Sequence, residues 1–305
     1  MERRQILAAL ASWLTALRGG QEAIEPTFTA SVKIVDILAS VRNKSGQIVS
    51  SLTKDDFVLL ENGRPQKIRY FSRESDLPLT VGLLIDTSMS QEKVLNAERG
   101  AILRFLDQVL RETKDKLFIM QFDMAVQVKQ ELTSSRRALE DVLNYVDTPS
   151  RRELSIQSGG GTMLYQAIFQ AVTGVLKNQL NRKALIVLSD GEDFGSEKTL
   201  TEAIEAAVKA DTLVYSIYFT GTGGGDGRGV LRRLAQGTGA GFFEVTKKQS
   251  IENIFDAIQE ELRGQYDLGF VSDQPTRLSE FRTLKLATKQ KGLVVQARES
   301  YMARP

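Results

Sequence analysis

The sequence predicts an α/β domain with a doubly wound, mostly parallel sheet, inserted in a small β-sandwich. From residue 79 to residue 263, short apolar runs typical of buried strands alternate with stretches whose apolar residues have helical spacing. Such alternation favours a parallel sheet with helices on both faces. The flanks, residues 26–78 and 264–305, show strand patterns instead, and neither is long enough to bury a good core alone.

The first flank is expected to hold several strands. Apolar and polar residues alternate in residues 28–41. Two further apolar runs, at residues 57–60 and 68–71, lie on either side of Asn62 and Gly63, a pair that is typical of hairpin turns. We therefore expect a hairpin shortly before the α/β domain begins.

The expected strands of the α/β domain are apolar runs at residues 81–85, 117–120, 184–188 and 213–218. Apolar residues recur at helical spacing in residues 102–110 and again in residues 251–262, the last expected helix. Because each helix of a parallel α/β unit runs back opposite to its strand, the domain begins and ends on one face. Both flanks leave from that face, so we expect them to form one β-sandwich.

Composition excludes several functional classes. The net charge of +2 implies neither nucleic acid nor an anionic membrane surface as a partner. The chain has no cysteine, which excludes disulfides, thiolate metal sites and a cysteine nucleophile. It also has no histidine, which excludes a Ser-His-Asp triad, a histidine general base and the usual zinc sites. These absences remove most common hydrolase mechanisms, and we expect a protein that is not an enzyme.

The N-terminus, residues 1–25, is expected to be a signal peptide or an N-terminal anchor. Arg3 and Arg4 precede an apolar stretch at residues 6–17, and small residues follow, an order typical of export signals. The stretch is shorter than the roughly 20 apolar residues that a transmembrane helix needs. No clean A-x-A cleavage site is present, so an amphipathic helix or an uncleaved anchor is the alternative. We expect an extracytoplasmic protein, periplasmic or secreted, which touches a membrane only through this segment if it is uncleaved.

Oxygen-bearing side chains follow two of the expected buried strands. Asp86, Ser88 and Ser90 stand at alternate positions after the first strand of the α/β domain. Asp190 follows a later strand, and Thr162 follows a run of glycines. Carboxylate and hydroxyl oxygens suit a hard cation such as Mg²⁺. The sequence therefore predicts one metal site formed by these residues.

In order and spacing, these residues resemble the metal-ion-dependent adhesion site of von Willebrand factor type A domains, whose motif is D-x-S-x-S, then a threonine, then an aspartate. The flanks resemble a bacterial VWFA-related family described from Acidobacteria, and this resemblance covers nearly the whole chain after about residue 25. The flanking sequences that carry it are Leu52-Thr53-Lys54-Asp55-Asp56-Phe57, Glu61-Asn62-Gly63-Arg64-Pro65-Gln66 and Ala297-Arg298-Glu299-Ser300-Tyr301.

The resemblance implies the strand order 3-2-1-4-5-6, which places Asp86 and Asp190 on either side of the crevice where strand order reverses. It also implies that Ser88, Ser90 and Thr162 bind the cation directly, while the two aspartates act largely through water. Mg²⁺ is the expected ion, with Mn²⁺ and Ca²⁺ as alternatives. One open coordination position would accept a carboxylate, so the resemblance implies a protein-binding module for cell adhesion whose protein partner offers an acidic side chain.

Three alternatives are open at this point, one of which is a purely structural module with a vestigial site, although the intact set of five residues speaks against it. Asp86 or Asp190, taken alone, would more simply cap the helix that follows it. A Mg²⁺-dependent phosphoryl-transfer enzyme would also place an acid at the end of the first strand, but the second acid of such phosphatases would stand where this chain has Ser88. Among nearby acids, Glu192 and Asp193 are expected to be solvent-facing loop acids and not ligands, and Asp123 is expected to be a hairpin-turn residue.

Overall fold

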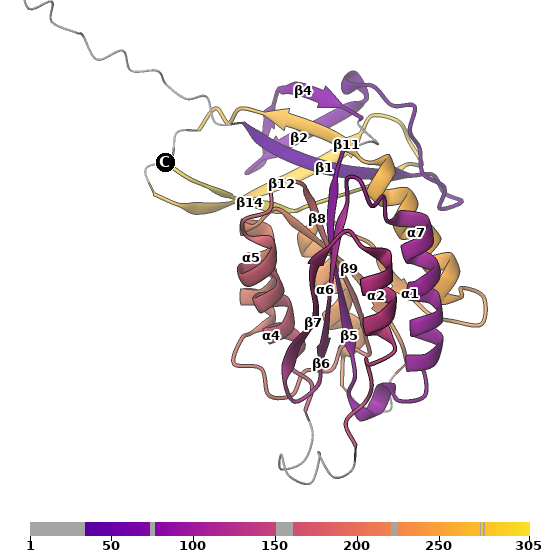
Figure 1. Ribbon diagram of the computed structural model, residues 1–305. Helices are drawn as coiled ribbons and strands as arrows, with labels where there is room; N and C mark the ends of the chain where they lie inside the picture. The colour runs from indigo at the N-terminus through magenta and orange to yellow at the C-terminus, as the bar shows by residue number, and fades with distance from the viewer. Residues whose placement is uncertain (1–33, 74–76, 151–160, 221–224, 275, 277) are drawn as a thin grey trace, which may run out of the picture. The chain divides into compact units, whose positions relative to one another are not determined.

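The computed structural model describes residues 34–305 except residues 74–76, 151–160, 221–224, 275 and 277 (Figure 1). The expected export segment and residues 26–33 of the first flank lie outside the described residues. Within the part that is described, no helix combines the length and the apolar character needed to cross a membrane.

A six-stranded sheet forms the centre of the α/β domain. Its strands are β5 (Leu79–Asp86), β6 (Lys116–Phe122), β7 (Val126–Thr133), β8 (Arg182–Ser189), β9 (Thr212–Tyr218) and β10 (Phe242–Glu244). Their order is β10-β9-β8-β5-β6-β7, and β7 alone runs antiparallel to its neighbour among these strands. Counted from β5, this is the predicted order 3-2-1-4-5-6.

Strand β5 lies at the centre of this sheet, and all of its residues are buried. A parallel strand that is covered on both faces needs a continuous apolar run, which explains why the sequence shows no alternation here. Val81, Leu83 and Ile85 pack into one hydrophobic cluster, and Leu84 packs into another on the opposite face. A Cβ atom at Gly82 would lie 2.3 Å from the Phe118 ring, so close packing requires glycine at that position.

Helices cover both faces of the sheet (Figure 1). One hydrophobic cluster includes residues of α1 (Leu95–Val109), α2 (Arg136–Leu143) and α7 (Ile251–Gly264). The other includes residues of α4 (Leu164–Gln170) with its π-helical continuation η3 (Ala171–Leu176), α5 (Leu200–Lys209) and α6 (Gly227–Thr238). The predicted helices at residues 102–110 and 251–262 lie in α1 and α7.

The flanks form two four-stranded sheets, in the orders β13-β1-β11-β4 and β14-β12-β2-β3. The first flank contributes β1 (Val35–Arg42), β2 (Phe57–Glu61), β3 (Arg64–Gln66) and β4 (Ile68–Ser72), with a short 3₁₀ helix η1 (Lys54–Asp56) before β2. The last flank contributes β11 (Tyr266–Phe270), β12 (Glu280–Thr288), β13 (Val294–Ala297) and β14 (Ser300–Ala303). Each sheet thus combines strands from both ends of the chain.

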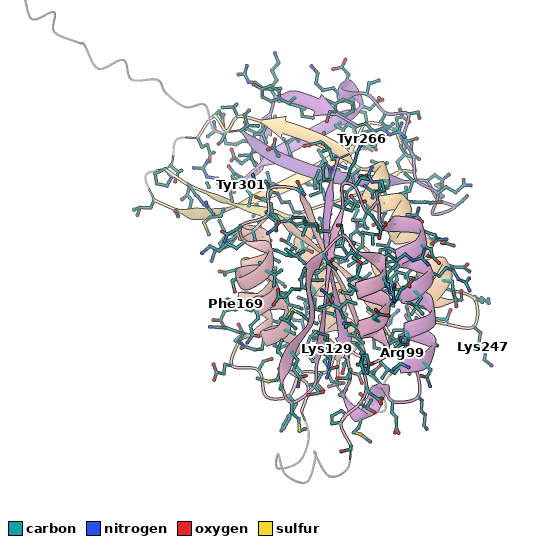
Figure 2. The ribbon with its side chains drawn as sticks, viewed as in Figure 1. Arg99, Lys129, Phe169, Lys247, Tyr266 and Tyr301 are labelled. Carbon is teal, nitrogen blue, oxygen red and sulfur yellow. The ribbon has the colours of Figure 1, made fainter. Side chains whose placement is uncertain are left out.

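The two sheets enclose one hydrophobic cluster, to which Tyr266 and Tyr301 contribute buried rings (Figure 2). The Tyr266 hydroxyl donates to the Val49 carbonyl at 2.9 Å and accepts from the Leu52 amide at 3.0 Å, so this buried phenol is satisfied. The predicted fold class is confirmed: a doubly wound α/β domain is inserted between the strands of a small β-sandwich.

A buried carboxylate connects helix α7 to the sandwich. Glu261 of α7 is fully buried, and its Oε1 accepts from Nε of Arg42 in β1 at 2.9 Å. Its Oε2 accepts from Nε2 of Gln296 in β13 at 3.3 Å. Burial raises the pKa of Glu261, while the Arg42 charge and these hydrogen bonds lower it. The last helix of the α/β domain is therefore held to two strands of the sandwich.

Candidate metal centre

The candidate ligands lie at the carboxyl edge of the central sheet. Asp86 is the last residue of β5, and Asp190 directly follows β8. These strands are parallel neighbours, with Ile85 paired to Leu188. The strand order reverses between them, and such a reversal opens a crevice at the carboxyl ends of the strands where ligands bind in open α/β sheets.

Asp86 is fully buried at this edge. Its Oδ1 accepts from the Ser88 amide at 3.0 Å, and its Oδ2 accepts from the Ser189 hydroxyl at 2.6 Å. Burial raises the pKa of the Asp86 carboxyl to about 7, because the hydrogen bonds only partly offset desolvation and Asp190 adds repulsion. The two carboxylates therefore interact across the crevice.

Ser88 and Ser90 lie together on the loop that leaves β5. The Asp86–Ser88 hydrogen bond turns the chain, and a 3₁₀ helix, η2 (Met89–Gln91), begins directly after Ser88. The two serine hydroxyl oxygens are 3.1 Å apart. Ser88 is nearly buried and Ser90 is half-buried, so this loop presents two adjacent hydroxyls beside Asp86.

Asp190 is held by the loop that follows β8. Its Oδ1 accepts from the Glu192 amide at 3.2 Å, and the Gly191 amide donates to the Ser189 hydroxyl at 2.9 Å. Gly191 has a φ of +77°, and a Cβ atom there would lie 2.2 Å from the Gly227 carbonyl oxygen. Glycine is therefore required at position 191 both for its conformation and for the close approach of α6.

Thr162 is brought to this loop by a backbone pairing. Its amide donates to the Phe194 carbonyl at 2.9 Å, and the Phe194 amide donates to the Thr162 carbonyl at 2.8 Å. The next amide, of Met163, donates to the Asp123 carbonyl at 2.8 Å, and the Asp123 carboxylate accepts from the Thr87 hydroxyl at 2.8 Å. These bonds connect the Thr162 segment to both aspartate loops.

Two neighbouring acids have roles that the sequence did not indicate. Asp123 is the expected hairpin-turn residue, since it bonds the Ala125 amide at 3.1 Å, but its bond to Thr87 also braces the loop after Asp86. Asp193 lies on a loop as expected, but it is half-buried and not fully exposed to solvent. Its Oδ1 accepts from the Tyr165 amide at 2.9 Å, at the start of α4, and from the Ser196 hydroxyl at 2.7 Å.

The helix-cap alternative does not describe Asp86 or Asp190. The amide bonded by Asp86 belongs to Ser88, whereas α1 begins at Leu95. The amide bonded by Asp190 belongs to Glu192, whereas α5 begins at Leu200. Both aspartates therefore bond to amides of the loops that follow their strands, not to the first turn of a helix.

The donor set fits a divalent cation. In the described residues, neither Asp86 nor Asp190 forms an ion pair with a lysine or arginine, and the charge of Asp190 is one of the causes that raise the pKa of Asp86. A dication would favour the charged form of these two buried carboxyls, which no basic side chain of the described residues pairs with. No group of three or more His, Cys, Asp or Glu side chains is placed to hold a metal in the described part of the chain, so a cation at this edge would need hydroxyl oxygens as well as carboxylates.

Glu98 is an unexpected acid beside this site. It is fully buried on α1, and within the described structure neither of its carboxyl oxygens has a hydrogen-bond partner. Burial, and then the charge of Asp86, raise the pKa of Glu98 well above its usual value of 4.5. Its place on the apolar face of α1, between Leu95 and Ile102, is the sequence signal that would have identified it.

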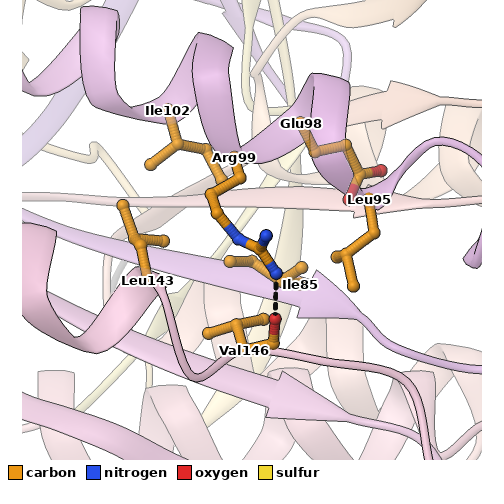
Figure 3. A pocket seen from close by; sticks show the side chains of 7 residues that line it. All are labelled: Ile85, Leu95, Glu98, Arg99, Ile102, Leu143 and Val146. Carbon is orange, nitrogen blue, oxygen red and sulfur yellow. Dashed lines mark hydrogen bonds between the residues drawn. The ribbon is translucent and has the colours of Figure 1, made fainter.

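Glu98 also lines a small pocket between α1, α2 and β5 (Figure 3). The neighbouring Arg99 reaches across this pocket and donates from Nη2 to the Val146 carbonyl at 2.6 Å. The other residues lining it are Ile85, Leu95, Ile102 and Leu143. Because neither carboxyl oxygen of Glu98 is hydrogen-bonded within the described structure, desolvation is the largest cause of its raised pKa.

The raised pKa of Glu98 leads us to expect that the free energy of unfolding depends on pH. Folded protein retains a proton that the unfolded chain releases above the usual pKa of 4.5, so the free energy of unfolding falls as the pH rises from 4.5 to the folded-state pKa. The loss is up to about 1.4 kcal/mol per pH unit. We expect Glu98→Gln, measured by urea denaturation with chelator present, to lose less stability over this range than the wild type. The exposed Glu92→Gln should follow the wild type, and parallel profiles for all three proteins would contradict the prediction.

Comparison with known proteins agrees with this geometry. Residues 81–192 match the family model of the von Willebrand factor type A domain. The inserted domain has the von Willebrand factor type A fold. A von Willebrand factor type A protein from Catenulispora acidiphila is 12% identical, with 90% of this chain and 74% of that chain covered and a TM-score of 0.50.

Proximal thread matrix protein 1 from the mussel byssus, in a form with a zinc-occupied MIDAS motif, is 16% identical, with 66% of this chain and 48% of that chain covered and a TM-score of 0.50. BatB from Bacteroides thetaiotaomicron is 20% identical, with 60% of this chain and 97% of that chain covered and a TM-score of 0.48. None of the curated proteins compared with the chain matches it.

Proposed function

We propose that this protein is an exported, noncatalytic module that binds a protein partner through a divalent cation. The observation that carries the proposal is the meeting of two buried aspartates, without a basic partner among the described residues, beside the hydroxyls of Ser88 and Ser90 at the strand edge. The von Willebrand factor type A fold supports it, because the proposed ligands stand at the motif positions of the metal-ion-dependent adhesion site.

In the proposed site, the hydroxyls of Ser88, Ser90 and Thr162 bind the cation directly. Asp86 and Asp190 contact it largely through water molecules and supply the negative charge. Mg²⁺ is the proposed ion, with Mn²⁺ and Ca²⁺ as alternatives, because all three prefer oxygen ligands. Three neutral hydroxyls leave the ion electron-poor, so an open position attracts an acidic side chain of the partner. This binding needs no bond to be broken.

The setting of the protein is part of the proposal. The arginine pair and the apolar stretch in residues 1–25 support an extracytoplasmic location, periplasmic or secreted, and this location is compatible with the proposed function in cell adhesion. Membership of the VWFA-related family described from Acidobacteria is proposed on the flanking sequences around residues 52–66 and 297–301.

The test is capture of partners from the envelope fraction of the native organism, with Mg²⁺ present and with chelator. We expect a partner that is retained by the wild type, released by chelator and lost with Thr162→Ala. The exposed Thr173→Ala is the matched control and should retain it. If the partner stayed bound in the presence of chelator, the proposal would be contradicted. Mg²⁺-dependent hydrolysis of para-nitrophenyl phosphate would also contradict it, because that is the result expected of a phosphoryl-transfer enzyme.

A further inference from the structure

Two large apolar side chains are exposed on the segments that carry the proposed ligands. Met89 is 43% exposed and stands between Ser88 and Ser90. Phe194 is 74% exposed and is paired through its backbone with Thr162. Single exposed apolar residues are ordinary on protein surfaces, but these two flank the site from different loops, one after β5 and one after β8.

The backbone of Phe194 is firmly held, so its exposure is not that of a loose loop. Both its amide and its carbonyl bond to Thr162, at 2.8 and 2.9 Å. The preceding residue, Asp193, bonds the start of α4. A Cβ atom at Gly161 would lie 2.9 Å from the Phe194 carbonyl oxygen, which shows how closely the two segments approach. An exposed aromatic ring on a backbone that is hydrogen-bonded in place can serve as an anchor in a protein interface.

Methionines border the same segments. Met124 is half-buried on the β6–β7 turn, and its Cγ would lie 3.6 Å from a Cβ atom at Gly161. Met163 is half-buried directly after Thr162. Methionine side chains are flexible and polarizable, and they adapt to apolar side chains of different shape. Together, Met89, Met124, Met163 and Phe194 form what we call the apolar rim.

We propose that this site selects a protein segment in which one acidic residue is flanked by large apolar residues. The proposal rests on the proposed function, since the cation binds the carboxylate. The apolar rim, and Phe194 in particular, would contact the flanking side chains and remove apolar surface from water. A cation alone would accept any accessible carboxylate, so the rim supplies the discrimination between partners.

The test uses three labelled peptides with the sequences Gly-Leu-Glu-Leu-Gly, Gly-Ser-Glu-Ser-Gly and Gly-Leu-Gln-Leu-Gly, with blocked ends. Their binding to the full chain is measured by fluorescence anisotropy with saturating Mg²⁺. We expect the first peptide to bind at least about tenfold more tightly than the second, and the third not to bind, since both flanking apolar contacts and the carboxylate are required. Phe194→Ser should reduce the ratio between the first two peptides to about twofold or less, with Mg²⁺ affinity unchanged by calorimetry.

Leu180→Ser is the matched control, because Leu180 is fully exposed just before β8 begins, at the opposite edge of the sheet. This variant should keep the wild-type ratio. Equal affinity of the first two peptides, no peptide binding to the Mg²⁺-loaded protein, or a ratio unaffected by Phe194→Ser would overturn the proposal while the metal site stands. Failure of Mg²⁺ itself to bind would instead overturn the proposed function.

Discussion

Replacing Gly191 by alanine is expected to destabilise the protein and to weaken the proposed metal site together. The added Cβ would lie 2.2 Å from the Gly227 carbonyl oxygen, and the φ of +77° is unfavourable for alanine. Overpacking against backbone and the strained φ together should lower the free energy of unfolding by about 3 kcal/mol. Displacement of the adjacent Asp190 should lower Mg²⁺ affinity by at least about tenfold.

Gly63→Ala separates the two causes of this loss. Gly63 has a φ of +78°, and a Cβ atom there would meet no described atom within 4 Å. It should therefore cost only the conformational strain, about 1 kcal/mol, and leave Mg²⁺ affinity unchanged. Urea denaturation and calorimetry measure both quantities. Equal losses of stability in the two variants would show that the approach of Gly191 to α6 does not matter.

Arg42→Ala is expected to cause the second large loss of stability. It removes the charge that compensates Glu261, which is fully buried at the junction of α7 and the sandwich. Breaking a buried pair by removing one partner typically costs about 3–5 kcal/mol. The loss should shrink at low pH, because a protonated Glu261 no longer needs a positive partner.

The control is an exposed pair in the same sandwich. Arg64 contacts Asp273 at 2.7 Å, with the two side chains 56% and 48% exposed. Arg64→Ala should cost less than about 1 kcal/mol, because solvent screens exposed pairs. If Arg42→Ala were as mild as Arg64→Ala by urea denaturation, Glu261 would not be the connection that holds α7 to the sandwich.

The fold was predictable from the sequence because its main signals are local. The apolar run before Asp86 does not alternate with polar residues. Such a continuous run is typical of a strand that is covered on both faces, and β5 is buried throughout. The aspartates at the ends of β5 and β8 were predictable as neighbours because parallel strands end at the same edge. These inferences need only periodicity and the rules of strand connection.

Other features depend on contacts between distant residues, and periodicity carries no signal for them. Arg42 and Glu261 are 219 positions apart, and their contact arises only when the flanks and the inserted domain are assembled. Asp193 looks like an ordinary loop acid until the pairing of Thr162 with Phe194 brings it to the start of α4. Glu98 is the intermediate case, since the helical period places it on the buried face but does not reveal that it lacks a partner.

The most direct test of the metal site is calorimetric titration of Mg²⁺ and Mn²⁺ into the wild type, Thr162→Ala, Asp86→Ala and the control Thr173→Ala. We predict binding of one ion to the wild type and the control, affinity reduced by at least about tenfold in Thr162→Ala, and a larger reduction in Asp86→Ala, which removes charge as well as geometry. Unchanged affinity across all four proteins, or no binding to any of them, would contradict the metal site and the adhesion function built on it.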